Sequence, residues 1–154
     1  MGVIAPGTPV PPISLARHGG EPFTNADFAG RTTVLVFYPY TFSGVCTEQF
    51  SIYNAVLDEI ADAGAVVYGV SCDNHYAQAA WRRSLGVDIE MLSDWEPKGA
   101  VSRALGVYHP AGMSTRALVI VGPDGVVRWS WEAEHVGVLP GANLIFDGLA
   151  ATAV

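Results

Sequence analysis

The chain has 154 residues, of which half are hydrophobic and 15% are charged. This length and composition suit a single compact domain and argue against an intrinsically disordered protein. Eight lysines and arginines against 15 aspartates and glutamates give a formal net charge of −7. An acidic chain without a run of basic residues is a poor candidate for binding nucleic acid or an anionic membrane surface.

The chain has two cysteines, Cys46 and Cys72, which are too few for the disulfide framework of a small secreted protein. Neither belongs to a C-x-x-C pair, and the four histidines are scattered, so we expect no metal site. The segment Met1–Val10 lacks the basic and long apolar regions of a signal peptide, and no apolar run is long enough to span a membrane. We therefore expect a cytoplasmic protein.

The first part of the chain is predicted to contain an extended arm followed by two strands. Four prolines in Ala5–Pro12 favour an extended conformation over a helix. Ile13–Ala16 is predicted to be a short strand that is closed by the Gly19-Gly20 turn. Thr32–Tyr38 is rich in β-branched and aromatic residues and almost uniformly apolar, and Pro39 ends it. This pattern indicates a strand that is buried on both faces, as in a parallel sheet.

Helices and strands are then predicted to alternate. Apolar residues at helical spacing favour one helix from Cys46 to Ala63, which Gly64 ends. The later elements are a buried strand (Ala65–Ser71), a helix (Tyr76–Leu85), a short strand (Ile89–Leu92), a short helix (Lys98–Leu105), a hairpin (Ala117–Val121 and Val126–Trp131) and a closing helix (Pro140–Ala150) with Pro140 near its first turn. We therefore predict a single α/β domain over residues 1–154, with a mixed central sheet and helices on both faces.

The segment Tyr38–Glu48 joins the end of a buried strand to the start of a helix, where ligands bind in open α/β sheets. Cys46 falls in the first turn of that helix, whose free N–H groups and dipole favour the reactive thiolate. Glu48 opposes this effect, so a further positive charge is needed, and Arg116 before the strand Ala117–Val121 is the best candidate. A structural, buried cysteine is the alternative interpretation.

The spacing Pro39-x-x-x-Ser43-x-x-Cys46 after an apolar strand, together with a distant Arg116, resembles the active-site signature of the peroxiredoxins. The resemblance extends to the Pro-rich arm and to the segment Val70–Asp73. It implies a thioredoxin-like fold. The chain looks most similar to the one-cysteine members of the alkyl hydroperoxide reductase E and bacterioferritin-comigratory types.

The resemblance implies a thiol-dependent peroxidase that reduces hydrogen peroxide and organic hydroperoxides without a metal, flavin or haem. Cys46 would attack the peroxide and become a sulfenic acid. Arg116 would stabilise the thiolate and the leaving oxygen, Ser43 would orient the peroxide, and Pro39 would limit access of water. Each has a simpler interpretation: Ser43 as a helix cap, Pro39 as the end of a strand, and Arg116 as a surface ion-pair residue.

The chain departs from many relatives around the nucleophile. Ser51 stands where many of them have a second, resolving cysteine, and Gln49 stands where the family has an acidic residue. Cys72 is the remaining internal candidate for resolution, although an inert buried thiol is the simpler interpretation. We therefore expect an external reductant: a thioredoxin, a glutaredoxin-like protein or a small thiol.

The family usually pairs through the region around its active-site loops, so the resemblance also implies a homodimer. Three alternative functions remain at this point. They are a peroxide sensor, a thiol–disulfide exchange protein without peroxidase turnover, and a holdase-like chaperone.

Overall fold

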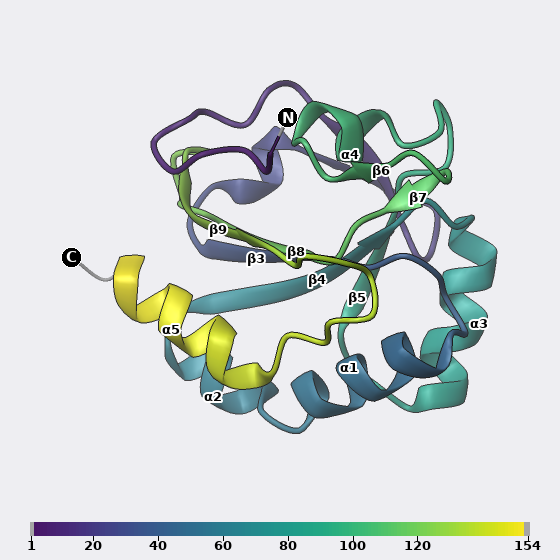
Figure 1. Ribbon diagram of the computed structural model, residues 1–154. Helices are drawn as coiled ribbons and strands as arrows, with labels where there is room; N and C mark the ends of the chain where they lie inside the picture. The colour runs from purple at the N-terminus through teal and green to yellow at the C-terminus, as the bar shows by residue number, and fades with distance from the viewer. Residues whose placement is uncertain (1, 153–154) are drawn as a thin grey trace.

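The computed structural model describes residues 2–152 and arranges them around a seven-stranded mixed sheet (Figure 1). The strand order is β2-β1-β5-β4-β3-β8-β9, in which β4 pairs in parallel with both β3 and β5 and the other pairs are antiparallel. The strands are β1 (Ser14–Arg17), β2 (Pro22–Thr24), β3 (Thr32–Phe37), β4 (Ala65–Ser71), β5 (Glu90–Ser93), β8 (Ala117–Val121) and β9 (Val127–Glu132), with β6 (Tyr108–His109) and β7 (Met113–Ser114) in a separate ribbon.

Helices cover both faces of the sheet, as the sequence predicts. The helical elements are η1 (Asn25–Phe28), α1 (Gly44–Asn54), α2 (Leu57–Asp62), α3 (His75–Leu85), α4 (Ala100–Ala104) and α5 (Ala142–Thr152). Buried residues of α1, α2, α3 and α5 form one apolar cluster with the sheet, while the N-terminal arm, η1 and α4 form the other (Figure 1). The sheet therefore separates two cores.

The central strands follow from their apolar sequences. Side chains alternate across β3, so that Val34 and Val36 lie in the α1 core and Leu35 and Phe37 lie in the α4 core, all fully buried. The bounds of β4 and β8 agree with the prediction, and β3 ends one residue earlier than predicted. Strands that are buried on both faces are thus the elements that sequence pattern locates best in this chain.

The prediction of one helix over Cys46–Ala63 is wrong, because the helix breaks into α1 and α2. At the break, Val56 leaves the helical region with φ −117° and ψ 15°. The last residue of α1, Asn54, accepts a hydrogen bond (2.8 Å) from the N–H of Asp88, which precedes β5. No glycine or proline marks this break, so tertiary contacts rather than local propensity decide it.

Other differences concern short elements and the chain ends. β1 lies one residue later than predicted, and β2, η1, β6 and β7 are too short to leave a periodic pattern. The Gly19-Gly20 turn is confirmed, with Gly20 at φ 96°. The closing helix begins at Ala142, so Pro140 lies before it rather than in its first turn. The carbonyl of Pro140 instead accepts a hydrogen bond from Tyr53.

Candidate active site

Cys46 is the third residue of α1, directly above the helix N-cap. The cap is Ser43, whose hydroxyl accepts a hydrogen bond (3.2 Å) from the N–H of Cys46. Gly44 and Val45, the first two residues of the helix, are exposed, and their N–H groups have no acceptor within the helix. The Cys46 side chain is fully buried. A covered sulfur thus lies in the first turn of a helix whose N-terminus is open to solvent.

Arg116 reaches the sulfur because of the register between β3 and β8. Phe37 pairs with Ala117 in this antiparallel pair, so Arg116 lies next to the end of β3, where Tyr38 follows. The guanidinium donates from Nη2 to Cys46 Sγ at 3.2 Å. Arg116 is 3% exposed, so it is not a surface ion-pair residue in this structure. A cation and a thiol that are 70 positions apart in the chain therefore meet in one buried site.

Two further hydrogen bonds hold the guanidinium. Its Nε donates to the carbonyl of Val136, in the loop before α5, and its Nη1 donates to Gln49 Oε1 at 2.7 Å. Gln49 Nε2 in turn donates to Tyr53 Oη (3.0 Å), and Tyr53 Oη donates to the carbonyl of Pro140 (2.6 Å). Among residues 2–152, no carboxylate lies within ion-pair distance of Arg116.

Sequence reasoning missed Tyr53 and the Val136 carbonyl as parts of this network. A signal for the first exists, because Cys46, Gln49 and Tyr53 follow one another at helical spacing and share one face of α1. No sequence signal marks Val136, whose contribution is a backbone oxygen. Burial raises the pKa of Tyr53 to about 12, so its hydroxyl remains a hydrogen-bond donor at neutral pH.

The loop before α1 is tied to the neighbouring strand. Pro39, which follows Tyr38 after the end of β3, is buried, and the N–H of Thr41 donates to Asp73 Oδ2 at 2.8 Å. Phe42 adopts φ 71°, a left-handed conformation that costs a residue with a side chain about 1–2 kcal/mol. Its ring packs against Trp81 with 6.5 Å between the ring centres. The fold thus imposes a strained loop at the place where α1 begins.

Replacing Ser43 by alanine is expected to lower the free energy of unfolding by about 1 kcal/mol, because the first turn of α1 loses its side-chain cap. Urea denaturation would measure this loss. Ser43→Thr is the matched control, because it keeps the capping hydroxyl and should leave stability close to that of the wild type. Equal stability of the alanine and wild-type proteins would contradict a capping role.

Cys72 lies on the other side of the sheet from Cys46. Side chains alternate along β4, with Tyr68 and Val70 in the α4 core, and Cys72 continues that series. Its sulfur lies 3.6 Å from the hydroxyl of Ser114, which is in β7. Burial raises the pKa of the Cys72 thiol. The two thiols therefore lie on opposite faces of the sheet.

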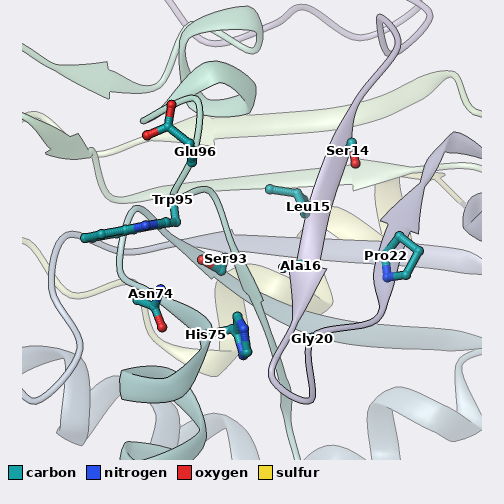
Figure 2. Close-up of a pocket in the computed structure, with 10 residues that line it drawn as sticks. All are labelled: Ser14, Leu15, Ala16, Gly20, Pro22, Asn74, His75, Ser93, Trp95 and Glu96. Atoms are coloured by element: carbon teal, nitrogen blue, oxygen red, sulfur yellow. The ribbon is translucent and has the colours of Figure 1, made fainter.

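A cavity of about 300 Å³ lies away from this site. Figure 2 shows that its walls come from β1, the β1–β2 turn, the start of α3 and the segment after β5, including His75 and Trp95. Neither Cys46 nor Arg116 lines it. Within residues 2–152, no cluster of three or more His, Cys, Asp and Glu side chains is arranged to bind a metal ion. In the same part of the chain, every helix is too short or too polar to cross a membrane.

Comparison with known proteins identifies relatives over most of the chain. The AhpC/TSA family matches residues 6–130. A peroxiredoxin of Thermotoga petrophila is 33% identical over 128 residues, which are 79% of this chain and 60% of the relative, so the chain spans about 60% of that protein. Alkyl hydroperoxide reductase E of Mycobacterium tuberculosis is 28% identical over 147 residues, covering 94% of this chain and 95% of the relative.

Solved structures show the same architecture. The crystal structure of Enterococcus faecalis AhpC superimposes with a TM-score of 0.87 at 27% identity, covering 99% of this chain and 93% of that one. This likeness confirms the predicted thioredoxin-like α/β fold. Because the family match extends over most of the sequence, the chain belongs to the AhpC/TSA family of peroxiredoxins.

Proposed function

We propose that this protein is a thiol-dependent peroxidase that reduces hydrogen peroxide and organic hydroperoxides, with Cys46 as its nucleophile. The observation that carries the proposal is the 3.2 Å contact between Arg116 Nη2 and Cys46 Sγ at the N-terminus of α1. A guanidinium and a helix N-terminus both favour the thiolate over the thiol. Relatives named peroxiredoxin and alkyl hydroperoxide reductase support the same reaction.

In the first step, the Cys46 thiolate attacks one oxygen of the peroxide in line with the O–O bond. An S–O bond forms and the O–O bond breaks, so the sulfur is oxidised to a sulfenic acid by two electrons and the peroxide is reduced. The leaving oxygen departs as an alkoxide or hydroxide and takes up a proton to give an alcohol or water. In this proposal Arg116, which contacts the sulfur, and the free N–H groups of Gly44 and Val45 stabilise the charge on that oxygen.

Ser43 and Pro39 have supporting roles in this proposal. The Ser43 hydroxyl accepts from the Cys46 N–H and keeps its own proton to donate to a bound peroxide, so capping and orientation are compatible. Pro39 is buried directly before the loop and has no N–H that would attract water to the site. Because the sulfur is fully buried, we propose that the exposed loop residues move aside to admit the substrate.

In this proposal an external thiol reduces the sulfenic acid, since Cys72 lies on the opposite face of the sheet from Cys46. One reductant thiol forms a mixed disulfide with Cys46 and releases water, and a second thiol displaces Cys46 to complete the cycle. A thioredoxin, a glutaredoxin-like protein or a small thiol could serve in this step. No metal, flavin or haem takes part in the proposed reaction. We propose a cytoplasmic location, where such thiols are kept reduced.

One equivalent of peroxide is expected to oxidise Cys46 and leave Cys72 as a free thiol. The raised pKa of Cys72 means a smaller thiolate fraction at neutral pH, and burial limits its access to reagents. Intact mass spectrometry, followed by peptide mapping after thiol labelling, would show one added oxygen on Cys46. Loss of both thiols with an internal Cys46–Cys72 crosslink would instead make Cys72 the resolving residue.

Repeated turnover separates the peroxidase from two of the alternative functions, the peroxide sensor and the thiol–disulfide exchange protein. Peroxide consumed in large molar excess over protein, with a thiol reductant present, requires a catalytic cycle. A peroxide sensor would stop after one equivalent. A thiol–disulfide exchange protein would reduce insulin disulfides without needing peroxide.

We propose that two copies associate through the surface around the active-site loop. Large apolar side chains are exposed there and on neighbouring elements. They are Tyr40, Phe42, Val45, Ile52, Tyr76 and Trp95. Exposed apolar groups in such number favour a protein–protein contact.

A further inference from the structure

The chain of hydrogen bonds behind Arg116 has a defined direction. Tyr53 Oη donates its single proton to the carbonyl of Pro140, at 2.6 Å, because a carbonyl can only accept. Tyr53 Oη must therefore accept from Gln49, and only the Nε2 group of that amide can donate. Gln49 Oε1 is then the end that faces Arg116. Tyr53 thus determines which way the Gln49 amide points.

This orientation gives the guanidinium an acceptor without a counter-charge. Gln49 Oε1 accepts from Arg116 Nη1 at 2.7 Å, but the amide is neutral. Val136 offers a backbone carbonyl, which is also neutral. Among residues 2–152, Cys46 is the one hydrogen-bond partner of Arg116 that can carry a negative charge. A buried cation without an anion is costly, so the charge of Arg116 favours the anionic form of the sulfur. The same charge acts to lower the pKa of Tyr53, although burial raises that pKa by more.

A carboxylate in the place of the amide would change this balance. The carboxylate would accept from Nη1 and carry a full negative charge. It would then neutralise part of the charge of the guanidinium, which would stabilise the thiolate less. The chain carries a carboxylate at the adjacent position, but Glu48 is exposed and points away from the buried face of α1. The amide, rather than the carboxylate, therefore occupies the buried position.

We infer that Gln49 is a positioning residue, oriented by Tyr53, that holds Arg116 against Cys46 and leaves the charge of the guanidinium to the sulfur. The inference rests on the proposed roles of Cys46 and Arg116. Gln49 contacts neither peroxide nor sulfur in this scheme, since it acts through Arg116. Other ionisable groups near the pair are Tyr38, Tyr53 and, on the exposed face of α1, Glu48. The pocket beside Val136 adds His109, Glu132, Glu134 and His135.

The test moves a carboxylate by one position at constant composition. In the double variant Glu48→Gln/Gln49→Glu, the introduced carboxylate pairs with Arg116, so the thiolate is stabilised less and the thiol form persists to higher pH. Single-turnover formation of the Cys46 sulfenic acid should be about tenfold slower at neutral pH. The pH–rate profile should shift to higher pH. A loss of structure alone would lower the rate without moving the profile.

Matched variants identify the cause of any change. Glu48→Gln alone should stay within about twofold of the wild type, because an exposed charge is screened by solvent. Tyr53→Phe should slow sulfenic acid formation with little shift of the profile, since it frees the amide to rotate and introduces no charge. It is also the test if the double variant fails to fold. Gln49→Met, which has a similar volume and no acceptor, should behave like Tyr53→Phe.

The outcomes distinguish this inference from the proposed function. A wild-type protein that consumes no peroxide refutes the proposed function. A wild-type protein that forms the Cys46 sulfenic acid, with an unchanged rate and pH profile in the double variant and in Tyr53→Phe, overturns the role of Gln49 and leaves the peroxidase in place.

Discussion

Replacing Cys46 by serine is expected to reduce peroxide consumption to less than about one thousandth of the wild-type rate. Serine keeps the size of the side chain and the helix N-terminus. It removes the sulfur, however, and a hydroxyl stays protonated at neutral pH even beside Arg116. The measurement is peroxide loss in the presence of a thiol reductant, with sulfenic acid trapping as a second readout.

Cys72→Ser is the matched control for this experiment. Its thiol is buried on the α4 side of the sheet and takes no part in the proposed cycle, so the variant should retain wild-type turnover. The proposed site would be contradicted if Cys46→Ser kept substantial activity and the double variant Cys46→Ser/Cys72→Ser lost it. That result would identify Cys72 as the nucleophile.

Arg116→Ala should slow oxidation of Cys46 by about 10²–10³-fold, the usual cost of removing one preorganised donor from a site that stabilises developing negative charge. The variant removes the cation that lies 3.2 Å from the sulfur and leaves Gln49 Oε1 without its donor. The rate of sulfenic acid formation under single-turnover conditions measures this effect directly, independently of the reductant.

Two further variants control for charge and for folding. Arg128→Ala removes an exposed arginine whose partner is Asp124, so it should leave the rate unchanged. Arg116→Lys keeps the charge but cannot reproduce the three-way geometry of the guanidinium, and an intermediate rate is expected. A folded Arg116→Ala protein, verified by circular dichroism, that reacts at the wild-type rate would remove Arg116 from the mechanism.

Local sequence was sufficient to predict several parts of the site. Ser43 and Cys46 are three residues apart, so a helix that starts between them places the cap and the sulfur in the same turn whatever the rest of the fold does. The strand β3, which precedes Ser43 and Cys46, can also be predicted from its own residues. From Val34 to Phe37 the strand is apolar on both faces, which favours a place in the centre of the sheet.

Long-range contacts could not be read in this way. The break between α1 and α2 contains no glycine or proline. At this break the backbone N–H of Asp88 donates a hydrogen bond to the side chain of Asn54. Alternation along β4 places Cys72 opposite the side chains of Ala65 and Val67, but alternation alone does not say which of the two faces receives α1. That choice decides whether the second thiol can reach the first.

The sequence by itself determined the central strands, the helix N-terminus and the cysteine in its first turn, because these depend on neighbours along the chain. The sequence and its resemblance named Arg116 as the partner of Cys46, but only the tertiary structure brings the two together, through the pairing of Phe37 with Ala117. Only the tertiary structure, too, shows that a neutral amide supports the guanidinium. The physical reason is that strand register and the packing of helices on a sheet set which distant side chains share a buried space.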